Sequence, residues 1–302
     1  MKSDVNIFHH VGLATADLEA TVARYELLGF TFTPISHVKI ALKPGAEPEP
    51  LGAGNRCGIF QNNYLEIVGI LDKKRWDTIT RAQRGPFDID GPISRYEGLH
   101  IMHFGTDDIE AVRERLMQQG TVCSEIARLQ RNVDTPDGER TMYAKSIHFP
   151  PGSNPEGLIQ IAQHVTPELV LQPRYMDQPN GAKNVTEVIV CTTDPARYSA
   201  KYERYTGHRG ERSGNRWVVN PGYSRVVVVA PEQLAEVIPG CEPPAIPFLA
   251  GFTVATASLD RTRELLNKNC IPFHENGERL IVRPEDARGC AVLFEKEGAS
   301  RF

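Results

Sequence analysis

Phe8-His9-His10-Val11-Gly12-Leu13-Ala14-Thr15 is the stretch that decides the fold, because it opens a pattern that recurs along the chain. The run is apolar enough for a buried strand, and Ala16-Asp17 follows it as a helix start signal. A helix is predicted from Leu18 to about Leu28, and Gly29 is expected to end it as a C-cap. The first thirty residues therefore predict a strand followed by an amphipathic helix.

The same strand and helix start occur three more times. The second copy is Leu99–Thr106 with Asp107-Asp108 as its cap, the third is Val185–Val190 with Asp194-Pro195, and the fourth is Phe252–Ala255 with Ser258. Short strand-like runs follow each helix, and in the first copy they are Thr31–Ile35, Arg56–Gln61 and Tyr64–Val68. A strand, a helix and three strands, four times over, predict an α+β fold of four βαβββ modules.

A proline-containing stretch separates the second module from the third. Pro167, Pro173 and the turn-forming Pro179-Asn180-Gly181 lie between His164 and Ala182. We therefore predict two domains, residues 1–172 with modules one and two, and residues 183–302 with modules three and four.

Composition limits the kinds of function. With 40% hydrophobic and 24% charged residues, the chain is typical of soluble globular proteins, and its net charge of −4 favours neither nucleic acid nor an anionic membrane as a partner. No apolar run approaches the roughly 20 residues of a membrane span. The six cysteines form no Cys-x-x-Cys pair, and most of them are expected to be core residues of a reduced, cytoplasmic protein.

Several motifs resemble one superfamily. His10–Glu19, followed by Leu28-Gly29-Phe30, resembles the opening of a glyoxalase/bleomycin-resistance module of the vicinal oxygen chelate superfamily. Gly52-x-Gly54-Asn55-Arg56 and Tyr64-Leu65-Glu66-Ile67 resemble its glyoxalase-like domain branch. The resemblance covers about residues 5–200 and implies paired modules that form a cup, with metal ligands on the first and last strand of each module. It does not fix a reaction, since the superfamily includes isomerases, lyases, dioxygenases and metal-free binders.

Strand alternation selects candidate ligands in the first module. Val11 and Leu13 suit the helix-packed side, so His10 should face the cup, and by the same alternation Glu66 should face it from the last strand. An imidazole and a carboxylate suit Zn, Mn, Fe or Ni as the divalent metal ion. The alternative is a hydrogen-bonded His–Glu pair without metal.

The second module departs from this pattern. Ile101 takes the position equivalent to His10 and cannot ligate, while His100 and His103 flank it with opposite parity. One register turns His103 into the cup, and a slip of one residue would turn His100 inward instead. Gln160 stands where Glu66 stands in the first module, and its carbonyl oxygen is a neutral ligand.

Other polar residues are candidates for substrate contacts and proton transfer. Asn55 and Arg56 are expected near the cup mouth, where the arginine either holds a carboxylate or phosphate of the substrate or bridges loop carbonyls as a structural residue. His148 is a candidate general base or a core histidine, and Glu66 doubles as a catalytic candidate. His9 is expected to point away from the cup. Modules three and four offer no ligand set, and Glu187 is expected to be an exposed strand carboxylate.

These residues favour a divalent-metal enzyme, of the isomerase or lyase type, acting on a small oxygenated organic substrate. An Fe(II) extradiol-type dioxygenase and a metal-free small-molecule-binding or drug-sequestering protein are the alternatives. Neither a nucleic acid nor a membrane is expected as a partner, and a homodimer is left open.

Overall fold

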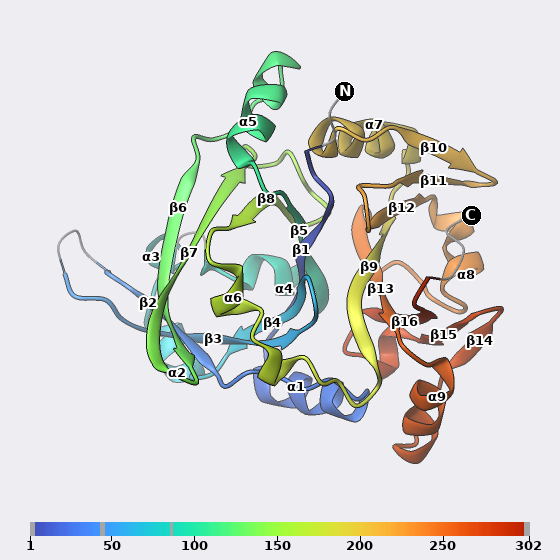
Figure 1. The fold of residues 1–302 in the computed structure, drawn as a ribbon, viewed down its shortest axis with the longest axis horizontal. Helices are drawn as coiled ribbons and strands as arrows, with labels where there is room; N and C mark the ends of the chain where they lie inside the picture. The colour runs from blue at the N-terminus through green and yellow to red at the C-terminus, as the bar shows by residue number, and fades with distance from the viewer. Residues whose placement is uncertain (1–3, 43–45, 85–86, 299–302) are drawn as a thin grey trace.

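The computed structural model describes residues 4–42, 46–84 and 87–298. These residues form two eight-stranded sheets with helices, an α+β fold (Figure 1). Each sheet holds two βαβββ modules, so the four-module prediction from the sequence is confirmed.

The first sheet has the order β2-β3-β4-β1-β5-β8-β7-β6. Its strands are β1 (Ile7–Thr15), β2 (Ser36–Ile40), β3 (Glu49–Ile59), β4 (Tyr64–Ile70), β5 (Gly98–Gly105), β6 (Ala127–Thr135), β7 (Gly138–His148) and β8 (Leu158–His164). Helices α1 (Leu18–Leu27) and α5 (Ile109–Gln118) follow β1 and β5, while α2 (Lys73–Asp77), α3 (Arg81–Arg84) and α4 (Asp90–Arg95) lie between the modules. Helix α6 (Pro167–Val170) and a 3-10 turn (Pro173–Tyr175) lead to the second sheet.

The second sheet repeats this order as β10-β11-β12-β9-β13-β16-β15-β14. Its strands are β9 (Ala182–Cys191), β10 (Gly210–Ser213), β11 (Arg216–Val219), β12 (Arg225–Val229), β13 (Phe248–Thr256), β14 (His274–Asn276), β15 (Arg279–Val282) and β16 (Ala291–Lys296). Its helices are α7 (Pro195–Thr206), α8 (Leu234–Val237) and α9 (Leu259–Lys268), with 3-10 turns at Pro231–Gln233 and Pro284–Asp286.

Helix caps follow the sequence signals. The Asp17, Asp108 and Asp194 side chains each accept a hydrogen bond from a backbone N–H in the first turn of α1, α5 and α7, and Ser258 does the same for α9. Gly207 ends α7 in the left-handed conformation expected of a C-cap glycine.

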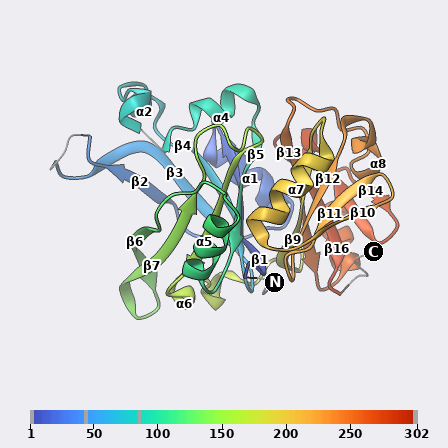
Figure 2. The same cartoon turned by 90° about the horizontal axis from the view of Figure 1, so that it is seen from above.

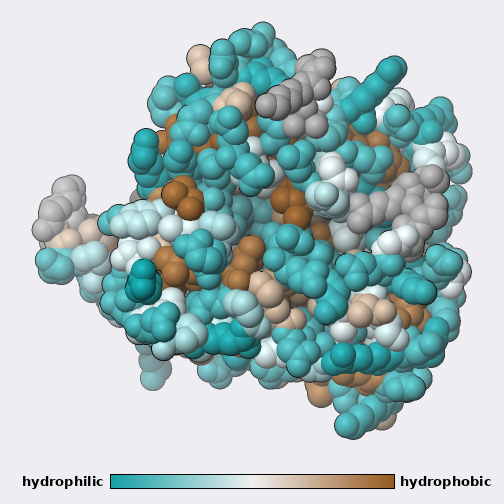
Figure 3. Space-filling view, viewed as in Figure 1, coloured by the Kyte–Doolittle hydropathy of each residue, from teal (hydrophilic) through white to brown (hydrophobic). Residues whose placement is uncertain are grey.

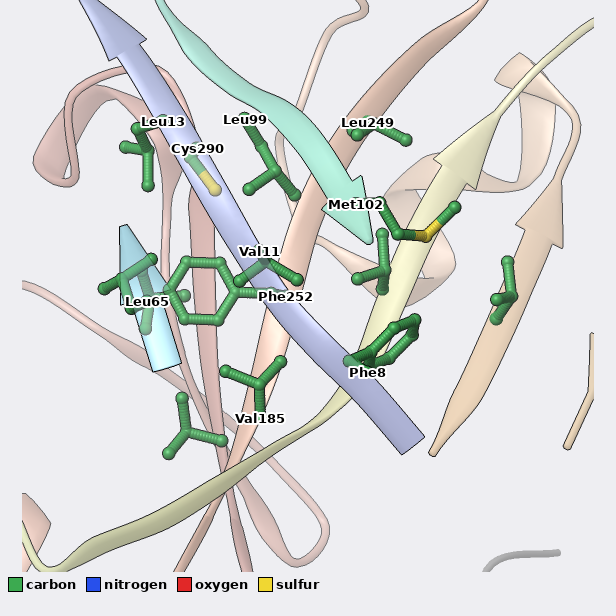
Figure 4. Close-up of a cluster of buried hydrophobic side chains, with 14 of the residues drawn as sticks. Phe8, Val11, Leu13, Leu65, Leu99, Met102, Val185, Leu249, Phe252 and Cys290 are labelled. Atoms are coloured by element: carbon green, nitrogen blue, oxygen red, sulfur yellow. The ribbon is translucent and has the colours of Figure 1, made fainter. Parts of the chain in front are cut away.

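The two halves lie side by side in both views (Figures 1 and 2). Their central strands pack back to back, and one continuous hydrophobic cluster joins them. Figure 4 shows Phe8 and Val11 of β1 beside Val185 and Phe252 of the second half. The concave faces of the two sheets therefore point away from each other.

A bulge recurs in the first strand of every module. The β1–β5 register shifts between Phe8 and His10 and again between Gly12 and Leu13, and the β9–β13 register shifts at the corresponding places. A bulge inserts one extra residue, so two consecutive side chains emerge on the same face. In β1 these two residues are His9 and His10.

Two features differ from the sequence-based expectations. The second strand of module one is Ser36–Ile40 rather than Thr31–Ile35, because Phe30 and Phe32 are buried in the core as the chain leaves α1. Among the described residues of the connection between modules one and two are three short α-helices, which the sequence periodicity did not predict. Among the described residues, none of the helices has the length and apolarity required to cross a bilayer.

Candidate metal centre

One row of paired residues crosses the concave face of the first sheet. Strand pairing places Tyr64 beside His10, His10 beside His103, and His103 beside Gln160. His148 of β7 follows Gln160 at the outer end of the row. Directly paired residues project from the same face of a sheet, so these side chains share the cup.

Glu66 lies opposite Gly12 and approaches His10 from the side. Its Oε2 is 3.6 Å from Nε2 of His10, and the ring centroids of His10 and His103 are 4.2 Å apart. Tyr64 stacks on the other face of the His10 ring at 4.5 Å. Two imidazoles and one carboxylate therefore meet on adjacent strands, and Tyr64 holds the central ring in place.

Burial determines the protonation of this group. Desolvation lowers the pKa of His10 well below its ordinary value, with a further contribution from His103, and it lowers the pKa of His103 to about 3. Burial raises the pKa of Glu66, against the opposing effects of a hydrogen bond from Asn55 and the charge of Arg131. Both imidazoles are therefore neutral, the form in which histidine coordinates a metal ion.

Asn55 supports the carboxylate, whereas Arg56 faces the other way. The Asn55 Nδ2 atom donates a hydrogen bond to Glu66 Oε1. Arg56 pairs with the core residue Ile67, and its Nε donates to the Thr33 carbonyl oxygen at 2.8 Å. Arg56 therefore does not stand at the cup mouth, because strand alternation places consecutive residues on opposite faces, and it takes the structural role of binding a loop carbonyl instead.

A different arginine lies close to the site. Arg131 of β6 donates a hydrogen bond from Nη1 to Ser36 Oγ of β2 at 3.4 Å, so it bridges the two edge strands of the curled sheet. Its charge lowers the pKa of Glu66. Sequence patterns did not single out this residue, although β6 alternates apolar and polar residues and Arg131 shares a face with Leu129 and Val133. Its contact with β2 spans 95 residues and leaves no local pattern.

The structure distinguishes His103 from His100. The His100 Nε2 atom lies 2.8 Å from the Tyr96 carbonyl oxygen, and its ring stacks on the Tyr96 ring at 4.0 Å. His103, by contrast, contacts His10, and its Nε2 is buried with no hydrogen-bond partner among the described residues. His148 is half-buried and shares a 2.9 Å hydrogen bond with Ser146 Oγ.

His9 also belongs to the concave face, contrary to the expectation that it points away. Its Nδ1 lies 2.7 Å from Nδ1 of His10, and its ring stacks on His164 at 3.8 Å. The bulge between Phe8 and Val11 causes the difference, because simple alternation would have sent His9 to the core. The sequence shows two consecutive histidines, but only the bulge explains why both side chains lie on the concave face.

Two hollows flank this group. A cleft of about 850 Å³ is lined by His9 and His164, together with Asn62, Thr106 and Tyr223. A smaller cavity of about 190 Å³ is lined by Asn55, Cys57, Ile59, Arg131 and Val170. Helix α6 lies in the hollow of the first sheet (Figure 1), where Val170 packs against Cys57, Ile59 and Tyr64. Figure 3 shows apolar patches within this half and along its boundary with the second half, surrounded by hydrophilic surface.

The donor set fits a divalent metal ion in kind. His10 and His103 offer neutral nitrogens and Glu66 offers a carboxylate, a combination that binds Zn, Mn, Fe and Ni. Two ligands about 2.1 Å from one metal lie roughly 3.0–3.4 Å apart, close to the 3.6 Å between His10 and Glu66. Across residues 4–42, 46–84 and 87–298, no three His, Cys, Asp or Glu side chains already converge in metal-binding geometry. Binding would therefore require small side-chain rotations.

The corresponding row of the second sheet is built differently. Arg225, Glu187 and Thr253 occupy the positions of Tyr64, His10 and His103. Glu187 is buried and bonded to Arg225, and Arg279 Nη1 donates to its Oε1 at 3.0 Å. The expectation of an exposed Glu187 is therefore wrong, because buried guanidinium groups compensate its charge.

Apolar residues fill the rest of the second concave face. Ile189, Phe248 and Leu293 of the sheet pack there against Leu234 and Val237 of α8. The second half therefore carries an ion-pair cluster and a packed core where the first half carries histidines.

Two curled sheets of paired βαβββ modules, with a histidine–carboxylate cluster in one cup, define a protein of the vicinal oxygen chelate superfamily. The chain belongs within it to the glyoxalase-like domain family, whose model matches residues 8–206. No curated protein matches the sequence.

Solved structures with the same fold are distant in sequence. A hypothetical protein from Staphylococcus aureus is 11% identical with a TM-score of 0.64, covering 96% of this chain and 98% of that one. The Mn(II)-bound glyoxalase from Novosphingobium aromaticivorans is 13% identical with a TM-score of 0.54, covering 98% and 83%. An extradiol ring-cleaving dioxygenase from B.fuscum is 12% identical with a TM-score of 0.52, covering 98% and 72%. These similarities establish the fold alone.

Proposed function

We propose that this protein is a divalent-metal enzyme of the isomerase or lyase type that acts on a small oxygenated organic compound. His10, His103 and Glu66 would hold the metal, and Gln160, next to His103 in the row, would supply a weaker fourth oxygen. Bound there, the metal would act as a Lewis acid toward a carbonyl or hydroxyl oxygen of the substrate.

One observation carries the proposal: the carboxylate of Glu66 is half-buried, and the charge of Arg131 offsets its burial only in part. Among the described residues, no lysine or arginine forms an ion pair with Glu66, and its one charged-group contact is with the neutral His10. Partial burial of a carboxylate that has no ion-pair partner costs free energy, which a bound cation would offset. In the second sheet the corresponding carboxylate, Glu187, forms ion pairs with Arg225 and Arg279.

The smaller cavity suggests where a substrate would lie. It is lined by Asn55, next to Glu66, and by Arg131, whose guanidinium is suited to bidentate binding of a carboxylate. Arg131 would thus take the role expected for Arg56. Glu66 and the half-buried His148 are the groups that could exchange a proton with the substrate, Glu66 because its raised pKa makes it a stronger base.

The donor set also supports a second candidate. Two histidines and one carboxylate with open positions are the ligands of non-haem Fe(II) oxygenases. An extradiol-type dioxygenase that uses the first cup therefore remains the alternative enzyme, whereas the second cup offers arginines in place of ligands.

Metal content tests the proposal. Untagged protein would be measured by elemental mass spectrometry beside His10→Ala and Glu66→Ala variants, with His100→Ala as a control on the same strand as His103. We expect near-stoichiometric metal in the wild type and in His100→Ala, and its loss in the other two. Iron, together with oxygen uptake on catechols, would favour the dioxygenase. No metal after reconstitution with Fe²⁺, Mn²⁺, Ni²⁺ or Zn²⁺ would overturn the proposal in favour of a metal-free binder.

A further inference from the structure

His9 and His10 form a hydrogen bond that the proposed metal site does not itself require. Their Nδ1 atoms are 2.7 Å apart, and both residues are buried. The bulge in β1 makes this contact possible, because it turns two consecutive side chains to the concave face. The same bulge occurs in the other three modules, where it holds His100-Ile101, Thr186-Glu187 and Ala250-Gly251, so this histidine pair belongs to the first module alone.

The contact fixes the tautomers of both rings. Two neutral imidazole nitrogens at hydrogen-bond distance share one proton, so one Nδ1 donates and the other accepts. His10 faces Glu66 with Nε2, the atom that would bind the metal. A neutral histidine that coordinates through Nε2 carries its proton on Nδ1, so His10 donates and His9 accepts. The proton of His9 is then on Nε2.

We propose, on the basis of the proposed function, that His9 is a positioning residue for the metal site. It accepts the Nδ1 proton of His10 and so holds the His10 ring with its Nε2 lone pair toward Glu66. In metal sites such an outer hydrogen bond raises the basicity of the ligand and sets its orientation.

The surroundings of His9 hold its ring for this task. His164 stacks on one side at 3.8 Å, and Tyr64 meets its ring edge-on at 5.7 Å. The Nε2 atom of His9 is buried and has no hydrogen-bond partner among the described residues. Within those residues, the bond to His10 is therefore the hydrogen bond that orients this side chain.

Cobalt binding tests the role of His9 without any need for a substrate. Metal-free protein would be titrated with Co²⁺, with visible absorbance and a competing chelator to measure the Kd. His9→Phe keeps the ring but removes the acceptor, and we expect its Kd to rise about 10- to 100-fold. His9→Asn places a carbonyl oxygen near the position of Nδ1, so we expect its Kd to stay within about threefold of wild type.

His164→Phe is the matched control, because it preserves a stacked ring beside His9 and leaves the bond to His10 intact. We expect wild-type Co²⁺ affinity in this variant. Equal affinities in His9→Phe and the wild type would overturn the inference alone. Absence of Co²⁺ binding by the wild type would overturn the proposed function, and this inference with it.

A second test uses nuclear magnetic resonance of ¹⁵N-histidine-labelled, Zn²⁺-loaded wild type to determine which ring nitrogen of His9 and of His10 carries the proton. It does not depend on the stability of any variant. We expect His10 to carry its proton on Nδ1 and His9 to carry its proton on Nε2. A proton on Nδ1 of His9 would overturn the inference.

Discussion

Glu66 and Glu187 face the concave sides of the two sheets in different electrostatic settings, Glu66 half-buried and Glu187 fully buried. Burial raises the pKa of Glu66, and no basic side chain in the described chain pairs with it. Burial also acts to raise the pKa of Glu187, but Arg279 and Arg225 outweigh it and hold that pKa at about 2. The first carboxylate therefore destabilises the metal-free fold, while the second is stabilised within it.

Replacing Glu66 should stabilise the metal-free protein against unfolding, although the same residue is needed for the proposed metal binding. We expect Glu66→Gln to raise the free energy of unfolding of the metal-free protein by about 1 kcal/mol, because the amide avoids the desolvation of a charge. Its carbonyl oxygen can still accept the hydrogen bond from Asn55. Urea unfolding of chelator-treated protein measures the change. Glu187→Gln is the control with the opposite expected sign, and a loss of stability in Glu66→Gln would contradict the argument.

Glu187 should make stability depend on pH at the acid end. Its pKa is depressed in the folded state, so its ionised form stabilises the fold above the unfolded value of about 4.5, and this contribution is lost as the pH falls toward 2. The contribution is on the order of 3 kcal/mol. Urea unfolding from pH 7 to pH 2.5 should show wild type and Glu187→Gln converging. A difference between them that stays constant with pH would refute this.

At the scale of elements, capping signals were reliable because they are local. An aspartate side chain reaches a backbone N–H three residues ahead whatever the rest of the chain does, as Asp108 does with Ala111 at 3.0 Å. The bulges are different, since they arise from the pairing of strands far apart in sequence. They decided that His9 joins the site, against the alternation that predicted otherwise.

Asp108 and its neighbour Asp107 provide a matched pair for testing the cap of α5. We expect Asp108→Ala to lower the free energy of unfolding by about 1 kcal/mol, because the N–H of Ala111 loses its acceptor. Asp107 is exposed, and Asp107→Ala should change stability by less than about 0.5 kcal/mol. Thermal unfolding followed by circular dichroism measures both. Equal effects of the two substitutions would argue against the cap.

At the scale of the whole molecule, the two sheets share one hydrophobic cluster. Phe8 and Met102 of the first half and Val188 and Phe252 of the second are fully buried in it. Separating the halves would expose these back faces to water, at roughly 25 cal/mol for each Å² of apolar surface. The domain limits 1–172 and 183–302 stay a prediction, and so does a homodimer.

The shared cluster predicts that both halves unfold together. Trp76 lies in the first half and Trp217 in the second, so Trp217→Phe and Trp76→Phe leave one fluorescent reporter in each. Within each variant, we expect the fluorescence and circular dichroism transitions in urea to coincide. A fluorescence midpoint clearly displaced from that of circular dichroism in either variant would show that the halves unfold independently.

The sequence alone determined the modules and the pairing of His10 with Glu66 in the proposed metal site. Caps, periodicity and the fourfold recurrence are local or repeated signals, and His10 and Glu66 follow from alternation within single strands. The sequence left His100 and His103 open, because one residue of register exchanges them. Strand pairing alone placed His103 beside His10.

Only the tertiary structure decided the surroundings of that pair. It turned His9 inward and Arg56 outward, brought Arg131 to Ser36 across 95 residues, and buried Glu187 against Arg225 and Arg279. These contacts depend on bulges, on sheet curvature and on which edges meet when a sheet closes. Such contacts cannot be predicted from local sequence patterns, because they depend on how strands that are far apart in the chain pair in the assembled sheet.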